Sequence, residues 1–271
     1  MRLRVNHQTS YRYLGQVASA AQTLRLTPRS YEGLNVLSWR VWADTRHALP
    51  SFSDGFGNIA HTHTVNHPHD GHTLFVEGEV ETSTSHGIVR GTLEPLPPLF
   101  FLRRTSLTMP DPAIAAMARS VAASGSVLKQ LHALLTAVRE RVDYRTGTTD
   151  PSTTAAAALA AGAGVCQDHA HIFIAAARLL NIPARYISGY LWTGFQSAEQ
   201  EASHAWAEAF VHDLGWVGFD PSNRICPTDA YIRLGVGLDY WSAAPVRGVR
   251  RGGTAESLAV SVMVKQAGGE Q

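Results

Sequence analysis

The chain of 271 residues has only two cysteines, Cys166 and Cys226, too few for a framework of disulfide bonds. Its formal net charge is +1 and 17% of its residues are charged, which argues against nucleic acid or an anionic membrane as a partner. No run approaches the roughly 18 apolar residues of a membrane-spanning helix. We therefore expect a neutral, soluble enzyme or binding protein.

The beginning of the sequence has no apolar segment of the kind found in a signal peptide. Arg2 and Arg4 carry charges where such a segment would lie. We therefore expect a cytoplasmic location. In that reducing compartment both cysteines would remain free thiols.

The first part of the chain has the pattern of short β-strands. Residues 3–7 and 11–13 alternate between apolar and polar side chains, and residues 37–41 mix aromatic with β-branched ones. Residues 53–58 contain two glycines and two Asx residues, which are typical of a turn. These features predict a β-sandwich domain over residues 1–100. The proline-rich segment that follows Glu94 would link it to a second domain over residues 101–271.

The second part has helical periodicity before it returns to strands. Asp111 can cap a helix that starts at a proline, and an apolar stripe over 127–142 predicts another helix. Thr154 and its neighbours can cap a helix over 155–161 that Gly162 ends. A strand is expected over 184–192, with a polar loop over 193–203 after it.

Cys166 lies where the next helix should begin. Gly162 and Gly164 break the preceding alanine run, and from Ile172 onward apolar residues recur at spacings of three and four. The unpaired N–H groups of a first helical turn stabilise a thiolate, which is the nucleophilic form of cysteine. A buried, inert thiol is the alternative interpretation of Cys166.

Two aromatic and apolar runs, residues 204–211 and 216–221, flank a short turn that contains Gly215. They predict an antiparallel hairpin with His204 and Asp220 at the same end. Thiol acyl chemistry requires a cysteine to attack a carbonyl, an imidazole to move the proton and a carboxylate to orient the imidazole. Cys166, His204 and Asp220 supply these groups. The backbone N–H of Cys166 is one candidate donor to the oxyanion, and a second is not identifiable.

The context of these three residues resembles the bacterial transglutaminase-like superfamily, and the resemblance extends over nearly the whole chain. The matching motifs in the second half are Gly164-Val165-Cys166-Gln167-Asp168-His169-Ala170-His171, Ile182-Pro183-Ala184-Arg185-Tyr186, His204-Ala205-Trp206-Ala207-Glu208 and Trp216-Val217-Gly218-Phe219-Asp220-Pro221. Tyr11-Arg12-Tyr13, Leu24-Arg25-Leu26-Thr27-Pro28, Asp54-Gly55-Phe56-Gly57-Asn58 and Ile232-Arg233-Leu234-Gly235 extend the likeness to both ends.

The resemblance implies an α+β fold in which a papain-like, transglutaminase-like core carries a catalytic triad of Cys166, His204 and Asp220. It leaves the acyl acceptor open, because the family includes peptidases, amidases and transglutaminases. Hydrolysis of a peptide or amide bond is the preferred activity, since water is always available. Transamidation to an amine and a catalytically silent binding module are the alternatives. We expect a peptide or protein substrate and no cofactor.

Other side chains near the triad have less specific signals. Trp206, Tyr240 and His169 are candidates for substrate contacts, although a packing role is favoured for the two aromatic residues and a packing or surface role for the histidine. Asp168 is expected to cap the helix that begins at Cys166, because a carboxylate is stabilised at a helix N-terminus.

Five histidines form the main competing signal. His61, His63, His67, His69 and His72 fall within one short stretch, and His61 and His63 would share a strand face, as a metal site requires. Pro68, Asp70 and Gly71 put part of the stretch in a turn, and no cysteine accompanies it. We expect surface histidines and no physiological metal, with a metalloprotein as the alternative.

Overall fold

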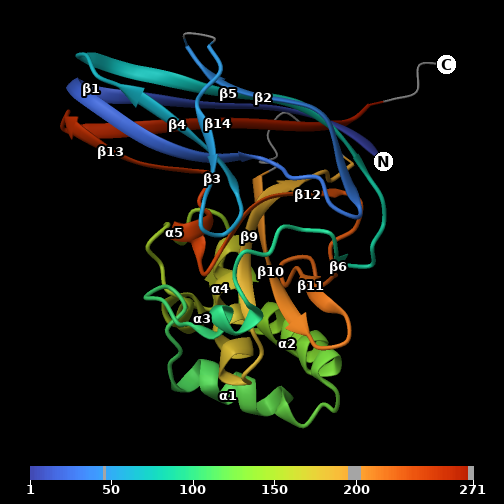
Figure 1. Cartoon of the computed structure of the whole chain (residues 1–271). Coiled ribbons are helices and arrows are strands. Elements are labelled where there is room, and N and C mark those ends of the chain that lie inside the picture. The colour runs from blue at the N-terminus through green and yellow to red at the C-terminus, as the bar shows by residue number, and fades with distance from the viewer. Residues whose placement is uncertain (45–46, 195–202, 268–271) are drawn as a thin grey trace.

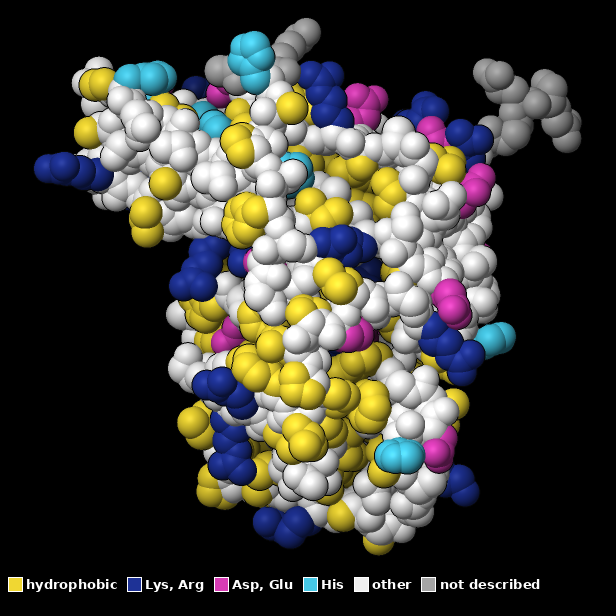
Figure 2. All heavy atoms as spheres, in the orientation of Figure 1, with side chains coloured by type: hydrophobic (Ala, Val, Ile, Leu, Met, Phe, Trp, Pro, Cys, Tyr) yellow, Lys and Arg dark blue, Asp and Glu magenta, His cyan; other side chains and the backbone are white. Residues whose placement is uncertain are grey.

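The structure, a computed structural model, describes residues 1–44, 47–194 and 203–267. In this part of the chain a seven-stranded sheet lies across a body that holds a five-stranded sheet and the helices (Figure 1). This arrangement confirms the α+β class. On the face shown in Figure 2, acidic and basic side chains are scattered among hydrophobic ones, in keeping with the balanced composition.

The large sheet is antiparallel and is built around one long strand, β1. Strands β2, β5, β1, β4 and β3 follow one another in this order, and β13 and β14 both pair with β1. The bounds are β1 Arg2–Thr27, β2 Leu34–Ala43, β3 Ser51–Ser53, β4 Ile59–Val65, β5 His69–Thr82, β13 Val246–Gly252 and β14 Ala255–Gln266.

Strand β1 explains why the expected sandwich of two sheets is instead one sheet. Every second residue of its first half is buried, from Leu3 and Val5 to Tyr11 and Tyr13, so one face covers the core. The first half pairs with β5 and β14, and the second half pairs with β4 and β13. Four strands are therefore hydrogen-bonded to the same central strand, and β2 and β3 extend this one sheet through β5 and β4.

The chain ends differently from the predicted domain division. Strands β13 and β14, which we expected to close the second domain, return to the first sheet: residues 255–266 pair with residues 3–14 of β1. The prediction of a single boundary near residue 100 is therefore wrong for the last strands. A sequence shows no sign of such pairing, because it joins segments from opposite ends of the chain.

The second body has the strand order β12, β9, β10, β11, β6, and helix α4 packs against β9 and β10. Its strands are β6 Ile88–Val89, β9 Ala184–Leu191, β10 Ser203–Val211, β11 Gly215–Phe219 and β12 Tyr231–Gly237, and a small parallel pair is formed by β7 Asp143–Tyr144 and β8 Ala163–Gly164. The helices are η1 Pro98–Leu102, α1 Pro112–Ala122, α2 Val127–Arg141, α3 Ala155–Ala161, α4 Cys166–Leu179 and α5 Tyr240–Ala243.

The local signals in this body are confirmed. The Asp111 carboxylate accepts a hydrogen bond from the Ile114 N–H at 2.8 Å and caps α1. Thr154 caps α3, and Gly162 ends it with a φ of 63°. Most of the loop predicted over 193–203 lies outside the described residues. Where the chain is described, no helix is both long enough and apolar enough to cross a membrane.

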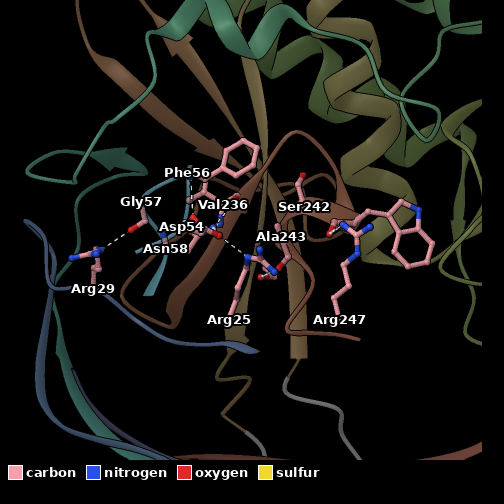
Figure 3. Close-up of polar contacts among 12 residues, drawn as sticks. Arg25, Arg29, Asp54, Phe56, Gly57, Asn58, Val236, Ser242, Ala243 and Arg247 are labelled. Carbon is pink, nitrogen blue, oxygen red and sulfur yellow. Dashed lines mark hydrogen bonds and ion pairs between the residues drawn. The ribbon is translucent and has the colours of Figure 1, made fainter. Parts of the chain in front are cut away.

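The turn at residues 53–58 fastens the large sheet to the second body (Figure 3). The Asn58 side chain donates to the Val236 carbonyl and accepts from the Val236 N–H, both at 2.8 Å. Asp54 accepts from Asn58 at 3.0 Å and from Arg25 at 2.7 Å, so it orients the amide. The turn that the sequence predicts is therefore also a contact between the two halves of the molecule.

Candidate active site

Cys166 is the first residue of α4, as predicted, and its entry into the helix is fixed from several sides. Strand β8 pairs with β7 directly before it. The Asp168 carboxylate accepts from the Val165 N–H at 2.8 Å and from the Thr149 hydroxyl at 2.7 Å, which is the expected capping role. A Cβ at Gly164 would lie 2.7 Å from Asp168, so only glycine fits there without a shift of the carboxylate.

The hairpin of β10 and β11 brings His204 and Asp220 to one end, because Ala207 pairs with Phe219. The His204 Nε2 atom lies 2.6 Å from Asp220 Oδ2. His204 lines the same cleft as Cys166, and its interaction with Cys166 helps to raise its pKa. Because Asp220 holds Nε2, the other ring nitrogen, Nδ1, is available to the thiol. The structure therefore brings the three predicted residues together.

Burial and charge act in opposite directions on this pair. Burial by itself would lower the pKa of His204, but the interactions with Asp220 and Cys166 outweigh it and raise the pKa to about 10. Burial would raise the pKa of Asp220, but its hydrogen bond with His204 and the imidazolium charge lower it. The pair is thus stable as a carboxylate beside an imidazolium.

Asp220 is held by more donors than the sequence suggests. Its Oδ2 atom accepts from the Tyr231 hydroxyl and from the Asn223 side chain, each at 2.7 Å. Its Oδ1 atom accepts from the Ser222 N–H at 2.9 Å. The Asp-Pro-Ser-Asn sequence after β11 is a turn signal that could have indicated Asn223. Nothing local indicates Tyr231, because it reaches Asp220 from β12.

Cys166 and His204 line a cleft of about 330 Å³ between the two sheets. The predicted Tyr240 lines it too, together with Tyr186 from β9. The opposite wall comes from the large sheet, through His7, Thr9 and Tyr11 of β1 and Leu258 and Val260 of β14. Sequence reasoning missed this wall, because its strands lie at the two ends of the chain.

The other two residues predicted to contact substrate, His169 and Trp206, are buried and do not line the cleft. His169 is fully buried and hydrogen-bonds the Ser222 hydroxyl and the Val142 carbonyl, and burial lowers its pKa to about 4. Trp206 is 2% exposed and stacks beneath His204, with ring centroids 6.2 Å apart. Both side chains therefore pack in the core next to the site and do not contact a substrate in the cleft.

A buried ionic network joins the three strands behind His204. Glu208 of β10 accepts from Arg185 of β9 and from Arg233 of β12, both at 2.7 Å. Burial would raise the pKa of Glu208, but the two guanidinium groups lower it. Arg185 also pairs with Glu94 at 2.6 Å and lies over the Trp216 ring. The network accounts for the charged residues in the motifs around the triad.

The histidine stretch lies in the large sheet, where His63 and His72 are buried, so the expectation of surface histidines is wrong for these two. His63 and His72 both donate to the Gln22 side-chain oxygen, at 3.3 and 2.8 Å. His61 hydrogen-bonds Thr27 at 2.9 Å. Within the described ranges, no group of three or more His, Cys, Asp or Glu is arranged to hold a metal ion.

A helix that opens at a cysteine and packs on an antiparallel sheet with a His–Asp pair defines a transglutaminase-like protein. The chain belongs to the transglutaminase-like superfamily: residues 115–221 match this family, and residues 3–81 match the bacterial transglutaminase-like N-terminal region. Both matches agree with the resemblance inferred from the motifs.

Similar proteins cover almost the whole chain. The uncharacterized protein ML0607 of Mycobacterium leprae is 31% identical over 97% of this chain and 98% of its own length. The uncharacterized protein Rv2569c of Mycobacterium tuberculosis is 32% identical over 92% of this chain and 87% of its own. The crystal structure of a proposed cysteine protease from Cytophaga hutchinsonii has a TM-score of 0.79 at 19% identity, covering 100% of this chain and 92% of that one. This last likeness shows the shared fold.

Proposed function

We propose that the protein hydrolyses a peptide or amide bond, with Cys166 as nucleophile, His204 as general acid and base, and Asp220 as the orienting carboxylate. The observation that carries the proposal is the position of His204, which is hydrogen-bonded to Asp220 and lines the same cleft as Cys166, whose thiol acts on its pKa. The substrate is a peptide or a protein, and the reaction needs no cofactor.

In the first half of the reaction, the Cys166 thiolate attacks the carbonyl carbon and the carbonyl oxygen becomes an oxyanion. The N–H of Cys166, at the start of α4, has no acceptor within the helix and is a donor for this charge. The His204 imidazolium gives its proton to the leaving nitrogen as the C–N bond breaks. The products are a free amine and a thioester on Cys166.

In the second half, His204 takes a proton from water as the water attacks the thioester. The C–S bond breaks, the carboxylic acid leaves and the resting pair forms again. Cys166 is half-buried in a cleft that reaches the surface, and this favours water as the acceptor. We place the activity in the cytoplasm, where a reducing environment keeps the thiol free.

An acceptor competition tests the reaction. The protein is given a peptide amide or a glutaminyl peptide, with and without an excess of primary amine, and the products are identified by mass spectrometry. Hydrolysis that the amine leaves unchanged supports the proposal, whereas incorporation of the amine would assign transamidation instead. Cys166→Ala is expected to abolish product formation with its thermal unfolding unchanged.

A second measurement separates an enzyme from a catalytically silent binding module. Iodoacetamide should alkylate Cys166 much faster than Cys226. Burial raises the pKa of Cys226, so less of it is in the reactive thiolate form. His204→Ala should remove the difference between the two cysteines. Equal, slow alkylation of both in the wild type would support the binding module.

A further inference from the structure

The wall of the cleft opposite Cys166 is a patch of two paired strands. Thr9 of β1 lies beside Val260 of β14, and Tyr11 lies beside Leu258. These four residues line the cleft that contains Cys166. Because the residues of one β-strand face alternate with those of the other face, Leu258 and Val260 point to the same side.

This face of β14 passes from the core into the open cleft. Val262 and Val264, further along on the same side, are each only 9% exposed because they pack in the core of the large sheet. Leu258 and Val260 are 55% and 40% exposed. The exposed surface of these two side chains in the cleft is therefore apolar. An apolar group bound there would remove it from water.

The cleft is lined mainly by aromatic and aliphatic side chains. Among the residues whose positions the structure gives, no aspartate, glutamate, lysine or arginine lines it. His7 is held by Tyr190 and Thr9, each at 2.7 Å, and its burial lowers the pKa to about 4, so the ring is neutral near pH 7. The remaining charge within the described lining is on His204, whose pKa is raised to about 10.

Two opposite charges beside this wall neutralise each other. Arg250 and Glu256 form an ion pair at 3.3 Å in an adjoining hollow, which Tyr11 and Leu258 also line. The His204 charge is already compensated by Asp220, so a charged substrate side chain in the cleft would lose water without gaining an unpaired opposite charge from the described lining. That loss is unfavourable, whereas an apolar side chain gains from the same transfer.

We propose that the wall formed by Tyr11, Leu258 and Val260 is the subsite for the side chain of the residue whose carbonyl Cys166 attacks, and that it selects an uncharged apolar or aromatic side chain. This inference rests on the proposed function of Cys166. A volume of about 330 Å³ is at the small end of ligand pockets, so it suits one large side chain with its adjoining backbone.

The test uses probes that label the thiol without requiring turnover. Acetyl-Phe, acetyl-Leu, acetyl-Glu and acetyl-Lys chloromethyl ketones are compared for their rates of alkylation at Cys166, located by peptide mapping. In each case the Cys166 sulfur displaces chloride. The Phe and Leu reagents should react at least about tenfold faster than the Glu and Lys reagents. Equal rates for all four would overturn the proposal.

Two matched variants assign the preference to this wall. Leu258→Asp puts a carboxylate on it, and should slow the Phe reagent about tenfold and speed the Lys reagent. Met263→Asp puts the same group on the other face of β14, at a residue that is 41% exposed, and should leave both rates unchanged. Iodoacetamide should alkylate Cys166 equally in both variants. If the two variants change the Phe and Lys rates alike, the subsite is not at this wall.

A parallel assay with amide substrates distinguishes the proposed subsite from the proposed hydrolytic activity. Acetyl-Xaa amides of the same four residues are tested in parallel for release of the carboxylic acid. If the alkylation preference holds and no amide is hydrolysed, the subsite stands and the proposed function fails. If all four amides are hydrolysed at equal rates, the proposed function stands and the subsite is refuted.

Discussion

Asp220→Asn removes one negative charge beside His204 and changes the size of the side chain very little. In the wild type the pKa of His204 is about 10 rather than its ordinary 6.5. At about 1.4 kcal/mol for each pKa unit, this difference favours the imidazolium by roughly 5 kcal/mol, shared between Asp220 and Cys166. The variant should therefore lower the pKa of His204 toward 6.5.

The raised pKa of His204 in the wild type also makes the unfolding free energy depend on pH in a defined direction. Because the folded protein binds the His204 proton more tightly than the unfolded chain does, the stabilisation is fully present below pH 6.5. It is lost as the pH rises to about 10. Wild type should exceed Asp220→Asn in unfolding free energy most clearly near pH 6, and the difference should shrink toward pH 10.

Two measurements follow this behaviour. NMR of protein with ¹³C-labelled histidine gives the titration midpoint of His204, whose signal is identified by its loss in His204→Gln. Urea unfolding at several pH values gives the stability difference. Asp213→Asn is the control, because Asp213 makes a similar contact with His212 at 3.1 Å but both side chains are exposed. It should change neither quantity.

The reasoning would be refuted if the His204 midpoint were the same in wild type and in Asp220→Asn. A stability difference that grew from pH 6 to pH 10 would also contradict it, because the sign of the linkage would then be reversed.

Three further substitutions probe the surroundings of the pair. Tyr231→Phe removes a 2.7 Å hydrogen bond to Asp220 and should lower kcat/KM about tenfold, the effect of one hydrogen bond to a charged group. Glu208→Gln removes the buried carboxylate that Arg185 and Arg233 share, leaving Arg185 with Glu94 alone, and should lower the unfolding free energy in urea by about 3 to 5 kcal/mol. Asn58→Ala leaves two backbone groups of β12 unpaired and should lower it by about 2 to 4 kcal/mol.

Each of these has its own control. Glu94→Gln changes a partly exposed partner of Arg185 and should destabilise less than Glu208→Gln, so an equal loss would contradict the importance of burial. Asn35→Ala is the control for Asn58→Ala. Asn35 is an exposed residue of β2, so its replacement should leave the unfolding free energy unchanged. Tyr231→Phe should remain fully folded at the temperature of the assay, since a general loss of structure would explain lower activity without any role for its hydroxyl.

Several parts of the site follow from residues that are close together in the sequence. Gly162 and Gly164 end one helix and permit the next to begin at Cys166, because glycine adopts the left-handed φ at 162 without strain and fits beside Asp168 at 164. The hairpin register that puts His204 beside Asp220 follows from two alternating runs around a short turn. Capping, turn chemistry and strand periodicity are local effects, so a sequence determines them directly.

What surrounds these residues depends on contacts between distant segments. Tyr231 and the wall of Leu258 and Val260 reach the site only because β12, β1 and β14 come together in space. Trp206 and His169, which the sequence marks as candidate substrate contacts, are buried by packing. The sequence therefore determined the helix and hairpin that carry the proposed nucleophile and the proposed acid and base, whereas only the tertiary structure decided the partners of Asp220 and the shape of the cleft. The reason is that strand pairing and burial join residues whose separation along the chain leaves no local pattern.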